Sequence, residues 1–275
     1  MKVVFIAGDQ PRHRFMAYRL AATGALAGLI IERREVFVPA PPRDIPDATR
    51  QLFVEHFRGR AESEVHILGG DPAGWPSGIE TLEIAPHQLN SDIVWKFLAT
   101  VRPALLLSYG CGKLSSETLA CAPERWNIHG GLSPWYRGAI TNFWPSYFLE
   151  PQMTGMTVHD TTEQIDGGDV VHQVAAPLVR GDGVHDIACR AIAALGQEMG
   201  VLVQAAGNAA PRKPHTTTGR VWRNSDWRPA HLHVIYELHG NRVVDRYLNG
   251  EFGPQRPPKL HTLASTTRLG HRPER

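Results

Sequence analysis

Hydrophobic and polar positions in the first thirty residues follow the order expected of a strand, a helix and a second strand. A short apolar run at 3–6 ends at Ala7-Gly8, residues 15–22 have helical spacing of apolar positions, and 26–31 form a second apolar run. A strand, helix and strand in this order typically make two parallel strands of one sheet. The pattern therefore predicts a βαβ unit at the start of the chain.

Two later segments carry the apolar stripe of a helix, and each precedes a strand candidate. One lies at 52–57, and the other lies at 93–101 after an Asn90-Ser91 pair suited to an N-cap. The continuous apolar run 103–109 suits a central strand buried on both faces, and 126–129 suits the next strand. Together these segments predict an α/β fold built on a parallel sheet.

The second half of the chain changes character near residue 206. Before that point we expect a helix at 143–149, strands at 156–159 and 169–176, and one long helix at 187–203. After it, the segment AAPRKPHTTTGR is typical of a linker, and the runs 232–238 and 242–248 favour either a hairpin or a pair of helices. We therefore expect a domain at 1–205 and, at 206–275, a linker with a small C-terminal element whose tail, from residue 254, is poorly ordered.

Composition excludes several classes of protein. The 275 residues have a formal net charge of +2, which argues against a dedicated nucleic-acid binder. The three cysteines include no CxxC pair, so neither a disulfide framework nor a thiolate zinc site is expected. The apolar run at the start is too short for a signal peptide, and no stretch approaches the roughly 20 apolar residues of a membrane span. We expect a cytoplasmic protein without a membrane partner.

The residues that indicate chemistry lie within 126–172. Asn127 and His129 alternate on one face of an extended segment at the carboxyl end of the predicted sheet, where α/β folds place ligands. Asp166 precedes two glycines in a tight loop that could return its carboxylate to the same place. An ordinary structural role is the alternative for each residue alone, as a hydrogen-bonded histidine, a turn aspartate or a strand-end amide.

An amide, an imidazole and a carboxylate without a nucleophilic Ser or Cys suit direct acyl transfer to an amine. The Asn127 amide and His129 can stabilise negative charge that grows on the acyl oxygen. His129 can also take the proton that the amine loses, while Asp166 orients the ring and raises its basicity. The pattern indicates that the substrate brings its own nucleophile.

The order of these motifs resembles the glycinamide ribonucleotide and methionyl-tRNA formyltransferase family. The resemblance rests on three motifs, which are N-x-H, L-S-P-x-Y-R-G and I-D-G-G-D in that order. Asp166 of the third motif follows His129 of the first by 37 residues. It implies a Rossmann-like formyltransferase fold that uses N10-formyltetrahydrofolate, with Asn127, His129 and Asp166 catalytic. It further implies that the folate lies on two loops, whose candidate residues are Ser108, Tyr109, Gly110, Cys111 and Gly112 in the first, and Thr162, Ile165, Gly167 and Gly168 in the second.

Other residues are candidates for binding the acceptor. Arg12 and Arg14 follow the first strand and could hold a phosphate or simply be solvated. The family's ribonucleotide members have a Gly-Ser-rich loop at that turn, and this chain departs from it. The remaining candidates are Trp135, Tyr136, Arg137 and His159, of which His159 could equally support the site from beneath. The spacing of His129, His159, Asp169 and His172 matches no zinc pattern, so no metal is predicted.

The resemblance favours a small-molecule amine as acceptor, and within that class a nucleotide-linked amino sugar. A methionyl-tRNA enzyme would carry a larger C-terminal barrel and a basic path for the RNA. An amino-acid or ornithine-like amine, a formyltetrahydrofolate hydrolase and an inactive folate-binding homologue are the alternatives. A hairpin near the C-terminus could also pair two subunits as a homodimer.

Overall fold

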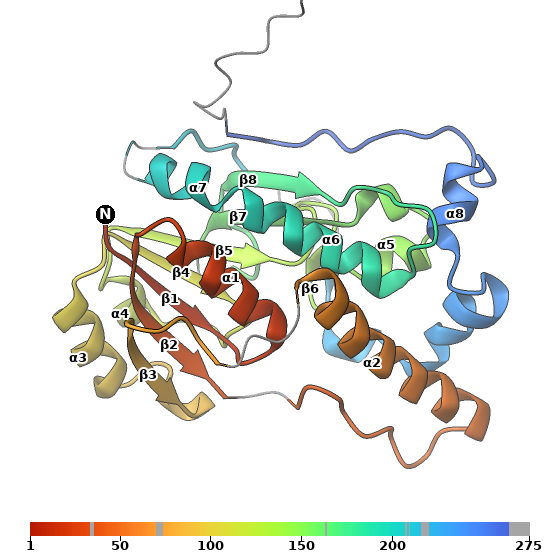
Figure 1. The fold of residues 1–275 in the computed structure, drawn as a ribbon, viewed down its shortest axis with the longest axis horizontal. Helices are drawn as coiled ribbons and strands as arrows, with labels where there is room; N and C mark the ends of the chain where they lie inside the picture. Colours follow the sequence, from red (N-terminus) through yellow and green to blue (C-terminus); the bar gives the residue numbers. More distant parts are fainter. Residues whose placement is uncertain are drawn as a thin grey trace, which may run out of the picture.

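The computed structural model describes residues 1–33, 36–69, 74–162, 164–206, 208, 210–215 and 220–263. Within these residues, seven strands form one sheet in the order β3-β2-β1-β4-β5-β7-β8 (Figure 1). The first five in this order pair in parallel, and β7 and β8 are antiparallel. The strands are β1 (Val3–Ala7), β2 (Leu26–Glu32), β3 (Glu80–Ile84), β4 (Leu105–Tyr109), β5 (Glu124–His129), β7 (Gly155–Asp160) and β8 (Val170–Ala175).

Helices cover both faces of the sheet. They are α1 (Pro11–Ala21), α2 (Asp47–Ile67), α3 (Asp92–Val101), α4 (Ser116–Leu119), α5 (Trp144–Tyr147), α6 (Val184–Gln197), α7 (Met199–Ala206) and α8 (Val243–Leu248). Short helical turns are η1 (Pro86–Gln88), η2 (Pro151–Met153), η3 (Asn224–Asp226), η4 (Pro229–His231) and the π-helical η5 (Val234–Leu238), and β6 (Arg137–Gly138) pairs with β9 (Val221–Trp222) outside the main sheet. No helix among the described residues is long and apolar enough to cross a membrane.

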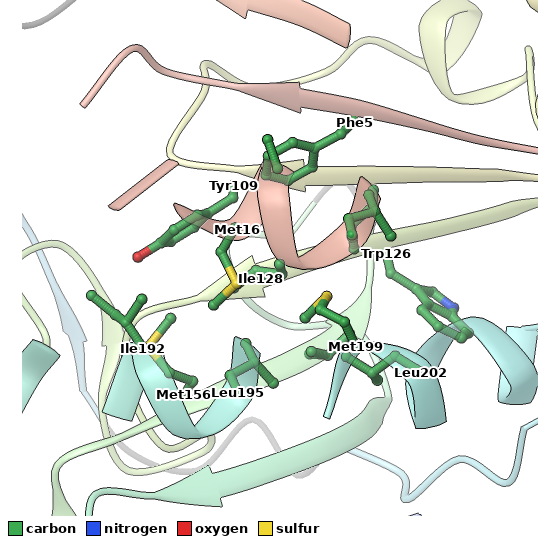
Figure 2. Packing of buried hydrophobic residues seen from close by; sticks show 14 of the residues in the cluster. Phe5, Met16, Tyr109, Trp126, Ile128, Met156, Ile192, Leu195, Met199 and Leu202 are labelled. Atoms are coloured by element: carbon green, nitrogen blue, oxygen red, sulfur yellow. The ribbon is translucent and has the colours of Figure 1, made fainter. Parts of the chain in front are cut away.

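Alternation along the central strands divides the core into two clusters. Val3 and Phe5 of β1 face α1, α6 and α7, whereas Val4 and Ile6 face α3 and α4. Figure 2 shows the first cluster, in which Trp126 and the sheet residues near it pack against helical methionines and leucines. Both faces are apolar, as expected of parallel strands covered by helices, and the predicted α/β architecture is confirmed.

The C-terminal element shares a third cluster with the rest of the chain. Leu232, Ile235 and Val243 pack with Phe53 of α2 and with the aromatic residues around α5. Its two apolar runs form η5 and α8, so of the two alternatives the helical pair is correct. The element therefore covers the end of the domain near α2 and α5 (Figure 1).

Residues of the tail near His261 are hydrogen-bonded to the edge strand β8. Gln173 of the edge strand β8 donates its backbone N–H to the carbonyl of His261, and the Gln173 side chain accepts from the N–H of His261. Leu263 is buried and donates its N–H to Nδ1 of His172. The bond to the Gln173 N–H satisfies a backbone group that an edge strand would otherwise leave unpaired. Residues 264–275 lie outside the described part.

Three local predictions also differ from the structure. The expected long helix at 187–203 is two helices that meet at Glu198, between Gly196 and Gly200, where helix propensity is low. Ser91 occupies the N-cap position of α3, but its hydroxyl donates to the Gln88 carbonyl instead of accepting from the helix. Strand β3 was not predicted, because four of its five residues are exposed or half-buried and carry no clear apolar pattern.

The shared third cluster predicts a large stability difference between two leucines of the C-terminal element. Leu232 is fully buried, whereas Leu238 is 66% exposed. We expect Leu232→Ala to lower the free energy of unfolding by about 2–5 kcal/mol, because it leaves a cavity. We expect Leu238→Ala to change it by less than about 0.5 kcal/mol. Denaturant unfolding measures both, and equal effects would contradict the packing described here.

Candidate functional site

Three neighbouring strands place a row of polar side chains across the sheet. Pairing sets Asn127 of β5 opposite Ser108 of β4 and opposite His159 of β7. The Ser108 hydroxyl donates to Asn127 Oδ1 at 2.9 Å, and Asn127 Nδ2 lies 3.2 Å from His159 Nε2. Nδ1 of His159 lies 2.8 Å from the Asp160 carbonyl, which only accepts, so Nδ1 carries a hydrogen. The row therefore orients the Asn127 amide.

His129 is held in one tautomer by the backbone. Its Nε2 lies 2.7 Å from the carbonyl oxygen of Tyr136, and since a carbonyl accepts, Nε2 carries the hydrogen. The basic nitrogen of the neutral ring is then Nδ1, which lies 3.3 Å from Oδ2 of Asp166. A proton bound at Nδ1 of His129 would therefore lie beside the Asp166 carboxylate.

Asp166 lies in the loop between β7 and β8, with a positive φ of 45°. The Arg137 guanidinium donates through Nε to the Asp166 carbonyl at 3.1 Å and through Nη2 to the Ile165 carbonyl at 2.7 Å. The Gly138 N–H donates to Asp166 Oδ2 at 2.8 Å, while Oδ1 lies 3.4 Å from His159 Nε2. Arg137 thus fixes the loop, and Gly138 fixes the carboxylate.

The charges of the site follow from burial and from these contacts. Burial alone would raise the pKa of the Asp166 carboxyl, but His129, His159 and the Gly138 N–H outweigh it and hold that pKa well below its usual range. Burial lowers the pKa of His129, although Asp166 and the Tyr136 carbonyl oppose the shift. At neutral pH the site therefore holds a carboxylate beside a neutral imidazole.

One cavity of about 560 Å³ opens onto these groups. Its volume is within the range of about 300–1,000 Å³ that small-molecule sites occupy. Gly110, at the end of β4, is exposed and has a positive φ of 62°, so ligand atoms can approach its backbone. Eight of the predicted site residues line this cavity: Arg12, Tyr109, Gly110, Cys111, Asn127, His129, Ile165 and Asp166.

The other predicted site residues do not line the cavity. Ser108, Tyr136, Arg137 and His159 lie behind it and contact the residues that do. Trp135 is 43% exposed, and the Arg14 guanidinium donates to the Asp9 carbonyl. The rest of this group comprises Gly112, Thr162, Gly167 and Gly168.

The residues predicted to be catalytic lie in a segment that matches a known protein family. A model of the formyl transferase family matches residues 78–205, which contain the three residues predicted to be catalytic. Residues 78–205 belong to the formyl transferase family. The formyl transferase domain thus includes β3 to α7 and the loop that carries Asp166.

One similar protein matches part of the sequence, and similar solved structures share the fold. Bifunctional polymyxin resistance protein ArnA of Wigglesworthia glossinidia brevipalpis is 32% identical over 91 residues, which cover 32% of this chain and 14% of that protein. A sugar N-formyltransferase structure from Shewanella sp. FDAARGOS_354 has 18% identity and a TM-score of 0.52, with 82% of this chain and 78% of that chain covered. The sugar 3N-formyl transferase WlaRD, solved with dTDP and 5-N-formyl-THF, has 13% identity and a TM-score of 0.54, covering 90% and 81%.

Two glycines of the domain make room for protein atoms. A Cβ on Gly131 would lie 2.5 Å from the Tyr136 carbonyl oxygen and 2.8 Å from Nε2 of His129. A Cβ on Gly168 would lie 1.8 Å from the Asp160 carbonyl oxygen. The space that a side chain of Gly131 would fill is therefore occupied by the Tyr136 carbonyl and the His129 ring.

The first turn contains an imidazole that the sequence did not single out. His13 is 1% exposed, and a Cβ on Gly110 would lie 2.4 Å from its Nε2. Its Nδ1 accepts from the Gln10 N–H at 3.1 Å, and Nε2 has no partner among the described residues. Beside it, Arg12 forms an ion pair with Glu64 at 2.8 Å. The positive charge expected at this turn is thus partly neutralised.

The cavity is also lined by side chains that the sequence did not single out as site residues. They include His56 and Phe57 of α2, Phe143, His185 of α6, and Trp227. The apolar stripe of α2 predicted a packing role for His56 and Phe57, and no local signal places His185 beside them. Among the described residues, no group of three or more His, Cys, Asp or Glu side chains is arranged to hold a metal ion.

Because several histidines are buried, we expect the free energy of unfolding to fall in mild acid. Burial lowers the pKa of His13, His56 and His129, lowers that of His185 to about 3 and lowers that of His172 to about 4, from an ordinary value of 6.5. Below pH 6.5 the unfolded chain therefore binds more protons than the folded chain, so the free energy of unfolding falls as the pH falls.

Each such histidine contributes up to about 1.4 kcal/mol per pH unit. We expect the melting temperature to decrease steadily from pH 6.5 toward pH 4, before the carboxylates titrate. Thermal melts in constant ionic strength measure this trend. A melting temperature that stays constant over this window would contradict the neutral, buried state of these rings.

Proposed function

We propose that this protein transfers a formyl group from N10-formyltetrahydrofolate to the amine of a nucleotide-linked amino sugar. The observation that carries the proposal is the convergence of Asn127, His129 and Asp166 on one cavity within a formyl transferase domain. These groups can bind an oxygen that gains negative charge and can accept a proton, which are the two tasks of acyl transfer to an amine.

The two loops expected to hold the folate lie on this cavity. Tyr109, Gly110 and Cys111 line one side, and Ile165 lines it beside Asp166. Ile165 is 61% exposed and offers an apolar surface, while Gly110 leaves its backbone accessible. The donor, when bound, supplies the formyl carbon as the electrophile. These positions fit a flat, partly apolar ring system with hydrogen-bonding edges.

The proton of the attacking amine has a defined destination. The Tyr136 carbonyl keeps the hydrogen of neutral His129 on Nε2, so Nδ1 has a free lone pair. The Asp166 carboxylate, 3.3 Å from Nδ1, stabilises the imidazolium that forms when this nitrogen takes the proton. His129 is thus the general base, and Asp166 is its electrostatic partner.

The formyl oxygen also has a partner. Ser108 and His159 hold the Asn127 amide by its oxygen and by its nitrogen, which leaves one Nδ2 hydrogen for a ligand. An amide fixed in this way costs little reorganisation when charge develops on the oxygen. In the overall reaction a C–N bond forms to the acceptor, the bond from the formyl carbon to N10 breaks, and tetrahydrofolate leaves with a proton on N10.

The choice of acceptor is supported by the size of the cavity and by the similar structures. A sugar N-formyltransferase and WlaRD share the fold over most of this chain. The C-terminal element contributes Asn224 and Trp227 to the cavity. An aromatic side chain at such a position suits a sugar ring or a base.

A direct assay distinguishes this function from its alternatives. Purified protein is incubated with N10-formyltetrahydrofolate and with dTDP-, UDP- or GDP-linked amino sugars, amino acids or no acceptor, and products are separated by mass. We expect a formylated nucleotide-linked sugar and tetrahydrofolate in equal amounts. Formate released without any acceptor would indicate a hydrolase, a formylated amino acid would change the acceptor class, and no turnover of the folate would refute the proposal.

Removal of each catalytic group should lower turnover without unfolding the protein. We expect His129→Ala and Asn127→Ala each to lower kcat by about 100-fold or more. We expect Asp166→Asn to act similarly, because it removes the charge that stabilises protonated His129. His87→Ala, at an exposed histidine of η1, is the control and should retain wild-type kcat. Wild-type turnover in the His129 variant would rule out the mechanism.

The structure predicts that Arg137 positions Asp166 and does not anchor the acceptor. Arg137→Lys removes the two-nitrogen fork that holds the Ile165 and Asp166 carbonyls. We expect kcat to fall about 10-fold while the KM of the acceptor stays within about 2-fold, since the catalytic groups lose alignment. Arg58→Lys on the exposed side of α2 is the matched control. A large rise in KM with an unchanged kcat would instead make Arg137 a substrate anchor.

A further inference from the structure

His56 is a polar ring that packs against three aromatic side chains. It is 5% exposed and lines the cavity. Its ring stacks on Trp227 at 6.1 Å and meets Phe57 and Phe143 edge to face, at 5.1 and 5.8 Å. A buried imidazole in such surroundings needs hydrogen bonds to offset the loss of water.

One nitrogen of His56 takes both of its described hydrogen bonds. Nδ1 lies 3.0 Å from the Tyr236 hydroxyl and 3.1 Å from Nε2 of His185. Tyr236 has no other hydrogen-bond partner among the described residues. A hydroxyl is a strong donor and an unprotonated ring nitrogen a strong acceptor, so we favour the arrangement in which the Tyr236 hydroxyl donates to Nδ1 of His56.

This arrangement leaves the hydrogen of neutral His56 on Nε2. No residue in the described part of the chain bonds to that nitrogen. Burial lowers the pKa of His56 well below its ordinary value, and the charged or titratable groups that act on it, His185 and Arg60, lower it further. His56 is thus a neutral donor, more than nine-tenths buried and without a partner, in the wall of the cavity.

The position of His56 favours the acceptor as its ligand. Residues 78–205, which match the family, contain the catalytic groups and both expected folate loops. His56 and Trp227 lie outside that range, on α2 and in the C-terminal element. Chemistry shared by a family resides in its shared domain, whereas parts that differ between members can select the substrate.

We propose that His56 is an acceptor-binding residue whose Nε2–H donates to an oxygen of the acceptor, while Trp227 packs against the same part of that molecule. The inference rests on the proposed formyl transfer and adds to it a specificity contact. Tyr236 and His185 act through His56 and are positioning residues.

The test compares variants that keep or remove the donor. His56→Phe keeps a planar ring but lacks the N–H, and His56→Gln keeps an N–H at the ε position. We expect His56→Phe to raise the KM of the amino-sugar acceptor about 10-fold or more, as for loss of a buried hydrogen bond. His56→Gln should recover most of that loss, and kcat and the affinity for 5-formyltetrahydrofolate should stay near wild type. His87→Phe makes the same chemical change at an exposed position and should leave KM unchanged.

A second variant covers the case in which His56→Phe does not fold. Tyr236→Phe removes one hydroxyl and frees the His56 hydrogen to move to Nδ1. Nitrogen-15 NMR of the histidine rings should show His56 protonated at Nε2 in the wild type and a mixture of tautomers in Tyr236→Phe, with a severalfold higher acceptor KM.

The outcomes separate the inference from the function on which it rests. If the wild type transfers formyl to a nucleotide-linked sugar but His56→Phe has an unchanged acceptor KM, the inference alone is wrong. A loss of folate affinity in His56→Phe would assign the residue to the donor and would also overturn it. If the wild type transfers formyl to none of the acceptors, the proposed function fails and the inference fails with it.

Discussion

A buried carboxylate between two imidazole rings is the constraint on which the site depends. Asp166 lies 3.3 Å from His129 and 3.4 Å from His159, and its loop is fixed by the Arg137 guanidinium. Without those partners a carboxylate at this depth would be neutralised by a proton, since burial favours its uncharged form. Because it remains charged, it can stabilise His129 once that ring takes up a proton. The geometry of the Asp166 loop and the basicity of His129 therefore depend on each other.

The cavity uses histidine in two different ways. Near the catalytic groups, His129 has a carboxylate at its basic nitrogen, so protonation is supported there. Among the described residues, His56 has a tyrosine hydroxyl and another histidine as hydrogen-bond partners, so its neutral form is supported. In the proposed reaction the same type of side chain would thus serve as a base at one position and as a fixed donor at the other. The difference comes from the partners of each ring, because both rings are buried.

The sequence predicted the parts of the molecule that depend on local pattern. Strands β1, β2, β4 and β5 and the catalytic loop were found, because apolar runs, glycine turns and the spaced Asn, His and Asp are visible along the chain. The sequence did not predict the features that depend on tertiary contacts. The roles of His56 and His185 depend on packing between α2, α6 and the C-terminal element, and the placement of residues near His261 depends on bonds to an edge strand. The hydrogen bonds of Arg137 to two carbonyls of the Asp166 loop also could not be predicted, because they depend on how that loop folds.

We infer that the cavity holds the formyl group of the donor between Asn127 and His129. A crystal structure of the protein with 5-formyltetrahydrofolate tests this most directly. We expect the folate to lie against Tyr109, Gly110 and Ile165. Its formyl oxygen should lie within hydrogen-bond distance of Asn127 Nδ2, and its formyl carbon should lie beside His129. A folate bound elsewhere on the surface, or a formyl group turned away from both residues in a fully occupied site, would contradict it.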